Sequence, residues 1–341
     1  MAVKRILTGI RPTGPLHLGH YAGALKMWAE LQKDYECFFM IADLQALTTH
    51  ADSPELIENS VREVLLDFFA AGLDPRRENV HFILQSGIPE LSELLNYFTM
   101  LVPFSELERN PTIKAERLTL KFSPTAGFMI YPISQAADIL FCSPIPFKEK
   151  DELLVPVGAD QVPHLEETNR VARAFNKKYG ELFLECKPKL SHFSRLPGID
   201  GAEKMSKSLG NAIFLSDSEE VVNEKARSMY TDPTKPRKGD PGHPENCPAY
   251  YYHQVFGDLG TLEDRASRCR SGELGCVECK SDLAKSLNEF LSPIRERRKE
   301  AEKLPLGKYL SDGTKYAREI AKNTVENVRR AMHLDYPSIL K

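Results

Sequence analysis

Two short segments of the chain carry residues whose types and spacing suit the handling of a polyphosphate. The first runs Thr8-Gly-Ile-Arg-Pro-Thr-Gly-Pro-Leu-His-Leu-Gly-His20, with two imidazoles three residues apart around Gly19. If a helix begins here, its N-terminus favours an anion, and the glycine lets a ligand approach the backbone. The competing interpretation is an ordinary strand-to-helix turn with two surface histidines, His17 and His20.

The second segment is Glu203-Lys-Met-Ser-Lys-Ser-Leu-Gly-Asn211, which places Lys204 and Lys207 three residues apart in a flexible polar stretch. Such a loop suits a polyphosphate, although an exposed charged loop is the commoner fate of a lysine pair. Neither G-x-x-x-x-G-K-[ST] nor G-x-G-x-x-G occurs here, which disfavours a P-loop NTPase and a dinucleotide cofactor.

Short apolar runs alternate with longer amphipathic stretches around these segments. The pattern predicts strands at 5–8, 37–41, 81–84 and 153–157, and helices at 18–32, 54–71, 91–101, 134–142 and 161–176. This alternation predicts a Rossmann-like, doubly wound parallel α/β sheet with ligands beyond the C-terminal ends of its strands. We expect this domain to occupy residues 1–215, with a looser insertion at about 103–130, and a helical domain to occupy residues 216–341.

The two segments together resemble the paired His-x-Gly-His and Lys-Met-Ser-Lys-Ser signatures of class I aminoacyl-tRNA synthetases. The resemblance narrows to the bacterial tryptophanyl-tRNA synthetase family at residues 154–170 (LVPVGADQVPHLEETNR), 229–233 (MYTDP) and 325–332 (VENVRRAM). It extends from Ile6 to about Met332. It implies a tryptophan–tRNA ligase that activates L-tryptophan with ATP and transfers it to tRNA(Trp). It also implies Mg²⁺ as counter-ion, a helical anticodon-binding domain and a homodimer.

The resemblance also implies residue roles. The reacting phosphates would meet His17, His20, Lys204 and Lys207. The ATP site would comprise Arg11, Pro12, Thr13, Gly19, His20, Gly158, Ala159, Asp160, Lys204, Met205, Ser206, Lys207 and Ser208. Tryptophan would meet Tyr131, Gln135, Asp138 and Gln161. Asp138 would accept a hydrogen bond from the indole N–H. An amino acid that lacks this donor would leave the buried carboxylate unpaired, at a large cost in binding.

Two alternatives stay open from the sequence. Gln135 stands where many family members have Met, and Tyr131-x-x-x-Gln135-x-x-Asp138 is similar to a pattern of the tyrosyl enzymes, so a tyrosine-specific synthetase is the runner-up. A non-catalytic RNA-binding protein on the same fold is the third hypothesis. The intact histidine and lysine sets argue against it, because binding alone does not require them.

Four of the seven cysteines crowd into one window, with the spacing C-x21-C-x6-C-x2-C: Cys247, Cys269, Cys276 and Cys279. Four thiolates suffice for a tetrahedral zinc site or an iron–sulfur cluster. A subgroup of bacterial tryptophanyl enzymes has a similar pattern, one residue longer in the first gap, that binds a [4Fe–4S] cluster. The resemblance therefore implies a [4Fe–4S] cluster, with Zn²⁺ as the alternative, and Arg265, Arg268, Arg270 and Lys280 beside it as contacts to the anticodon arm.

The composition sets wider limits. The 341 residues are 42% hydrophobic and carry 45 basic against 48 acidic side chains, a net charge of −3, as in ordinary globular proteins. No run approaches the ~20 apolar residues that span a bilayer, and no secretion signal is visible. We therefore expect a cytoplasmic protein with reduced cysteines and no membrane or DNA partner.

Overall fold

The computed structural model describes residues 2–118, 123–191, 196–202, 205–207, 209–336 and 339. Lys204 and Ser208, two predicted phosphate contacts, lie outside these residues. The strands are β1 (Lys4–Ile10), β2 (Glu36–Ile41), β3 (Val80–Leu84), β4 (Glu152–Val157) and β5 (Lys187–Leu190). The helices of the first two-thirds are α1 (Leu18–His20), α2 (Lys26–Leu31), α3 (Asp43–His50), α4 (Pro54–Ala70), α5 (Glu90–Thr99), α6 (Phe104–Arg109), α7 (Pro111–Arg117), α8 (Ala126–Leu140) and α9 (Val162–Tyr179). The remaining helices are α10 (Glu219–Ser228), α11 (Pro248–Phe256), α12 (Leu262–Arg270), α13 (Cys276–Ala301) and α14 (Leu306–Ala331).

The five strands form one parallel sheet in the order β3-β2-β1-β4-β5, which confirms the predicted Rossmann-like fold. Strand β2 reads Glu-Cys-Phe-Phe-Met-Ile, and its last five residues are buried, as expected where helices cover both faces of a parallel sheet. The strand order reverses between β1 and β4, so a ligand crevice is expected beyond their C-terminal ends.

Two apolar cores lie on the two faces of the sheet. On one face, Trp28 stacks on Phe39 with ring centroids 5.6 Å apart, and α4 and α13 cover them. On the other face, Phe38 packs edge-on against Phe141, among side chains of α5, α8, α9 and α14. Both cores hold the sheet rigid, so that its C-terminal edge is a fixed platform. No helix within the described ranges is long and apolar enough to cross a membrane.

Strand β5 and helix α3 were not predicted from the sequence. Strand β5 reads Lys-Pro-Lys-Leu, has no buried residue and pairs only with β4. Lysine and proline are typical of exposed sheet edges, where they block further pairing, but they carry no strand signal in the sequence. The predicted insertion contains the two short helices α6 and α7.

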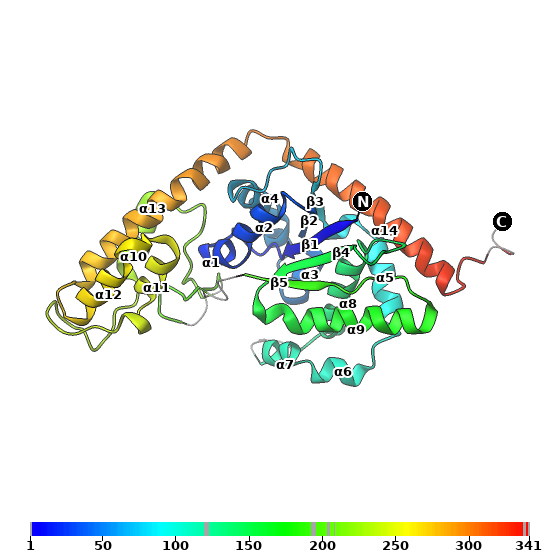
Figure 1. The fold of residues 1–341 in the computed structure, drawn as a ribbon, viewed down its shortest axis with the longest axis horizontal. Helices are drawn as coiled ribbons and strands as arrows, with labels where there is room; N and C mark the ends of the chain where they lie inside the picture. The colour runs from blue at the N-terminus through cyan, green and yellow to red at the C-terminus, as the bar shows by residue number, and fades with distance from the viewer. Residues whose placement is uncertain are drawn as a thin grey trace.

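The helical region of the chain divides in space. Helices α10 to α13 lie together to one side of the sheet, whereas α14 runs back along the α/β layers (Figure 1). In α14, Thr314 accepts a hydrogen bond from Leu84 N at 2.9 Å and Thr324 donates one to Phe141 O at 2.7 Å. Gly313 permits this approach, because a Cβ there would lie 2.3 Å from Phe82 O. Although the sequence pattern groups α14 with the helical domain, it packs mainly against β3 and α5.

Candidate active site

The two histidines lie at the turn that leads from β1 into α1. Their rings are in contact at a tilt of 37°, with centroids 3.8 Å apart, and the backbone N–H of His17 donates to Nδ1 of His20 at 3.2 Å. A Cβ on Gly19 would lie 2.9 Å from both Nδ1 and Cε1 of His17. Glycine is therefore required here for ring packing, in addition to any approach by a ligand.

The two phosphate-type segments, nearly two hundred residues apart in the chain, lie side by side. Leu18 N donates to Ile213 O and Leu215 N donates to Leu16 O, both at 2.9 Å, so the histidine turn pairs with the residues that follow the lysine loop. The Lys207 ammonium donates to Gly14 O at 2.6 Å. Burial lowers the pKa of Lys207 to about 8, against the opposing effect of the Asp67 carboxylate.

A cleft of about 370 Å³ opens beyond the C-terminal ends of β1 and β4, at the expected reversal of strand order. Its lining brings together predicted residues from three separate parts of the chain: Arg11, Thr13, His20, Tyr131, Gln135, Asp138, Gly158 and Gln161. The cleft is polar at the nucleotide-type loops and ends on residues of α8. This distribution matches a site that holds a charged group at one end and a ring at the other.

Other predicted residues lie beside the cleft and do not form its described wall. Pro12 is buried, Met205 is 2% exposed, and Ser206 N donates to Asn211 Oδ1 at 2.7 Å. His17 lies behind His20, and Ala159 begins the short helical turn that includes Gln161. Asp160 belongs to the same turn, and its side chain is outside the described structure.

Asp138 is the deepest charged group of the cleft and is 3% exposed. Gln45 Nε2 donates to its Oδ2 at 2.7 Å, while Gln85 Nε2 donates to Oδ1 and Oδ2 at 2.9 and 2.8 Å. Burial raises the pKa of Asp138 to about 7, and the two amide donors oppose that effect. A carboxylate has about four acceptor sites, so these three hydrogen bonds leave one for a ligand donor.

Three residues of the site were missed in the sequence: Gln45, Gln85 and His164. Gln85 follows directly after β3, and Gln45 lies in the first turn of α3, four residues after β2 ends, so both lie at the C-terminal edge of the sheet, a position from which they could have been predicted. His164 Nε2 lies 3.1 Å from the hydroxyl of Tyr131, whose pKa is raised mainly by burial. His164 lies within the segment that resembles the synthetases, but its spacing alone does not indicate contact with Tyr131.

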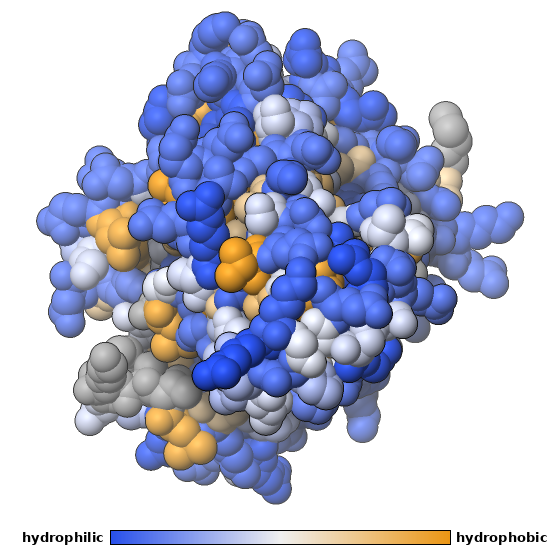
Figure 2. Space-filling model, turned by 90° about the vertical axis from the view of Figure 1, so that its left-hand side faces the viewer, coloured by the Kyte–Doolittle hydropathy of each residue, from blue (hydrophilic) through white to orange (hydrophobic). Residues whose placement is uncertain are grey.

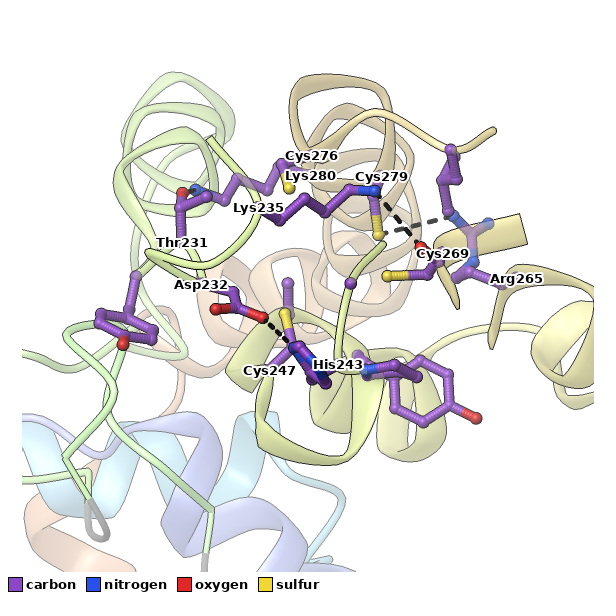
Figure 3. Close-up of a pocket in the computed structure, with 16 residues that line it drawn as sticks. Thr231, Asp232, Lys235, His243, Cys247, Arg265, Cys269, Cys276, Cys279 and Lys280 are labelled. Carbon is purple, nitrogen blue, oxygen red and sulfur yellow. Dashed lines mark hydrogen bonds and ion pairs between the residues drawn. The ribbon is translucent and has the colours of Figure 1, made fainter. Parts of the chain in front are cut away.

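The four clustered cysteines line one pocket in the helical region, between α11, α12 and the start of α13. The sulfurs of Cys247, Cys269 and Cys279 point toward a common space (Figure 3). Burial raises the pKa values of all three thiols, that of Cys279 to about 11. Among the described side chains, no group of three or more histidine, cysteine or acidic residues is arranged to hold a single metal ion.

The basic residues beside this pocket are engaged within the protein. Lys280 is 7% exposed and donates to Met229 O and Thr231 Oγ1, so its predicted contact with RNA is wrong in this arrangement because its ammonium is buried. Arg265 Nη1 lies 3.9 Å from Cys279 Sγ. The more exposed Arg268 and Arg270 form ion pairs with acidic neighbours. The end of the molecule formed by this region is mainly hydrophilic (Figure 2).

Paired histidine and lysine segments at the reversal point of a parallel sheet define the catalytic domain of a class I aminoacyl-tRNA synthetase. The model of the family "tRNA synthetases class I (W and Y)" matches residues 2–292, and the chain belongs to this family.

Tryptophan–tRNA ligases of several bacteria are similar to this chain over nearly its whole length. That of Thermotoga maritima is 44% identical over 337 residues, which cover 97% of this chain and 99% of the relative. That of Clostridium longisporum is 46% identical over 346 residues, or 98% of each chain. The tryptophanyl-tRNA synthetase of Campylobacter jejuni, solved with ADP and tryptophan, superposes with a TM-score of 0.81 at 31% identity, covering 97% of this chain and all of that one. Among the alternatives from the sequence, these relatives favour the tryptophan ligase.

Proposed function

We propose that this protein activates L-tryptophan with ATP, forming tryptophanyl-adenylate and pyrophosphate, and then transfers the amino acid to the 3′ end of tRNA(Trp). One observation carries the residue roles: the histidine turn and the lysine loop meet at the mouth of a cleft that ends on buried Asp138. The adenylate requires a cationic phosphate site and an amino acid site within one bond of each other. The cleft has both.

The reaction needs positioned donors more than a covalent nucleophile. The carboxylate of tryptophan attacks the α-phosphate, and negative charge develops on the phosphoryl oxygens and on the departing pyrophosphate. His20 lines the cleft, His17 packs against it, and Lys207 reaches the same segment by its hydrogen bond to Gly14 O. Lys204, by its place in the same loop, is proposed to share the pyrophosphate. Preformed donors of this kind act without reorganisation during the reaction.

We propose hydrogen-bond partners at the amino acid end of the cleft for the indole N–H and for the ammonium group of tryptophan. Asp138 keeps one acceptor site for the indole N–H, and Gln45 and Gln85 hold the carboxylate that offers it. The Tyr131 hydroxyl, fixed by His164, and the Gln161 amide are proposed to hold the ammonium group.

Mg²⁺ accompanies ATP in this proposal as the counter-ion of its phosphates. Among the described lining residues, only Glu116 and Asp138 carry carboxylates, and Asp138 already accepts hydrogen bonds from two amides. We therefore expect the ion to be coordinated mainly by phosphates and water, as is usual for this metal at nucleotide sites.

Amino-acid-dependent ATP–pyrophosphate exchange, run separately with each amino acid, tests the activity. We expect exchange with tryptophan and none with tyrosine. Exchange with tyrosine alone would refute the substrate assignment, and no exchange with any amino acid would refute the enzyme assignment.

We propose that the four cysteines hold a [4Fe–4S] cluster. All four face one pocket, where Arg265, Lys235 and Lys280 provide positive charge next to the thiolates. A tetrahedral zinc site is the alternative occupant, because four thiolates suit either group. When bound, the cluster would cross-link the loop before α11, α12 and α13.

Metal analysis of anaerobically purified protein tests this proposal. We expect about four irons per chain and absorbance near 400 nm. Both should be lost in Cys279→Ser and kept in Cys186→Ser, which alters a core thiol of 2% exposure far from the pocket. Zinc without iron would contradict the cluster.

We also propose that the region from residue 216 to the end of α13 binds the anticodon arm of the tRNA, and that α14 braces the catalytic layers. Arg270 and Lys285 leave 60% and 74% of their side chains exposed at the outer face of this region. Charge reversal of both should raise the KM for tRNA severalfold and leave tryptophan-dependent exchange unchanged. Lys322→Glu on α14 is the control, and an equal effect from it would contradict the proposal.

A cytoplasmic homodimer completes the proposal. Three apolar side chains, Met100, Phe104 and Leu118, are 68%, 63% and 88% exposed within one stretch around α6 and α7. Exposed apolar residues gathered in this way are typical of an interface. Sedimentation should show a dimer that Phe104→Glu weakens, and a monomeric wild-type protein would refute it.

A further inference from the structure

A buried carboxylate outside the cleft joins the helical region to the histidine turn. Asp67, in the last turn of α4, is 0% exposed and lines neither the cleft nor the cysteine pocket among the described residues. Nothing in the chemistry described so far requires a charge at this position. Since charged groups are rarely buried without a strong reason, its partners need an explanation.

One oxygen of Asp67 faces the active site. Its Oδ2 accepts a hydrogen bond from the backbone N–H of Leu16 at 2.7 Å. Leu16 directly precedes His17. Two helical turns before Asp67 on α4, the hydroxyl of Ser60 accepts a hydrogen bond from Gly14 N at 2.7 Å. Helix α4 therefore anchors the turn at two backbone positions, and Lys207 donates to the carbonyl of Gly14 between them.

The other oxygen of Asp67 faces α13. Its Oδ1 accepts a hydrogen bond from Nη1 of Arg298, whose side chain is 11% exposed. Arg298 also pairs with Glu63 on the outer side of α4, where Glu63 keeps 35% of its side chain exposed. Burial raises the pKa of Asp67 to about 6, whereas Arg298 and the Leu16 N–H oppose that effect.

Helix α13 carries this contact over a long distance. It has 26 residues, or about 39 Å at 1.5 Å per residue, and begins at Cys276 beside the cysteine pocket. Arg298 lies near its other end. A change in the position of α13 therefore reaches the histidine turn through one side chain.

We propose that Asp67 is a positioning residue that fixes the Leu16–His17 backbone for catalysis and couples its position, through Arg298, to helix α13. The proposal rests on the ligase activity stated above. It assigns Asp67 no contact with ATP or tryptophan. Its expected effect is on the reacting phosphates, because Asp67 bonds to the histidine turn and is not among the described residues that line the tryptophan end of the cleft.

The test compares Asp67→Asn and Arg298→Gln with Glu63→Gln in tryptophan-dependent ATP–pyrophosphate exchange. Asparagine keeps an acceptor for Leu16 N–H but loses the charge that holds Arg298. Rates are expressed per active site by titration of adenylate formation, so that unfolded protein does not count. We expect Asp67→Asn and Arg298→Gln each to lower kcat tenfold or more, with the KM for tryptophan within twofold of the wild type. Glu63→Gln should change neither quantity by more than twofold.

The double variant Asp67→Asn/Arg298→Gln tests the coupling. We expect it to be no slower than the worse single variant, because both remove the same connection. Arg298→Lys should restore part of the rate. A normal kcat per active site in Asp67→Asn would overturn the positioning role, and multiplied losses in the double variant would overturn the coupling. If the wild type itself shows no exchange, that result refutes the proposed ligase activity and not the role of Asp67.

Discussion

Replacement of Asp138 by asparagine tests how the cleft recognises the indole ring. The carboxylate accepts three hydrogen bonds from Gln45 and Gln85, which leaves one acceptor site for the indole N–H. An asparagine has a single oxygen, and its amide nitrogen would face one of the glutamine donors. The variant therefore loses a hydrogen bond to a charged acceptor, about 1.5–3 kcal/mol. At 1.4 kcal/mol per tenfold, kcat/KM for tryptophan should fall about 10- to 150-fold.

Exchange kinetics with a substrate analogue identify the cause of that loss. A tryptophan analogue with sulfur in place of the indole N–H should be a poor substrate for the wild type and no poorer for Asp138→Asn. The KM for ATP should stay within about threefold. Glu167→Gln is the control, because Glu167 is also a buried carboxyl, 3% exposed, but lies outside the described lining of the cleft. Equal losses for tryptophan and for the analogue would refute a hydrogen bond to the indole.

Three further predictions follow from the geometry. Gly19→Ala should displace the His17 ring, since the added Cβ would lie 2.9 Å from it. The variant should lower kcat for exchange about tenfold and leave the KM for tryptophan unchanged. An unaltered kcat would contradict the tight packing. Lys207→Met should lower the exchange rate about a hundredfold. Burial lowers the pKa of Lys207 to about 8, so the wild-type rate should decline above pH 8 as the ammonium loses its proton. A rate that does not change with pH in this range would contradict a contact between Lys207 and the phosphates. Burial raises the pKa of Asp138 to about 7. Between about pH 4 and 7 the folded chain therefore binds the proton of this carboxyl group more tightly than the unfolded chain does. The contribution of Asp138 to stability falls as the pH rises through that window. Denaturant melts should therefore show Asp138→Asn gaining on the wild type from pH 5 to 7, and a constant difference would contradict the raised pKa.

The predicted fold was confirmed where the sequence pattern has a direct physical cause. Apolar runs such as residues 37–41 must be buried on both faces, and amphipathic stretches such as α4 and α9 must cover a sheet. Elements without such a pattern were missed. Strand β5 is a charged edge that exists only because β4 offers it backbone partners. Helix α14 has a clear packing face, but periodicity does not indicate which surface receives it.

The site shows the same division. The resemblance to class I synthetases predicted His17, His20 and Lys207 as one functional set, and their segments are paired in the structure. The support around them was not predictable. Gln45 and Gln85 bond to Asp138 because parallel strands β2 and β3 end at the same edge, a relation that exists only after the sheet has formed.

The sequence by itself determined the class of chemistry, because imidazoles, ammonium groups and a carboxylate are fixed by residue type and their order along the chain. It also determined the parallel sheet, because hydrophobic periodicity acts locally. The tertiary structure alone decided which charges are buried and what they hold. Lys280 is an interior donor, and Asp67 connects α13 to the histidine turn. Burial and partnership depend on contacts between residues far apart in the chain, and no local pattern specifies them.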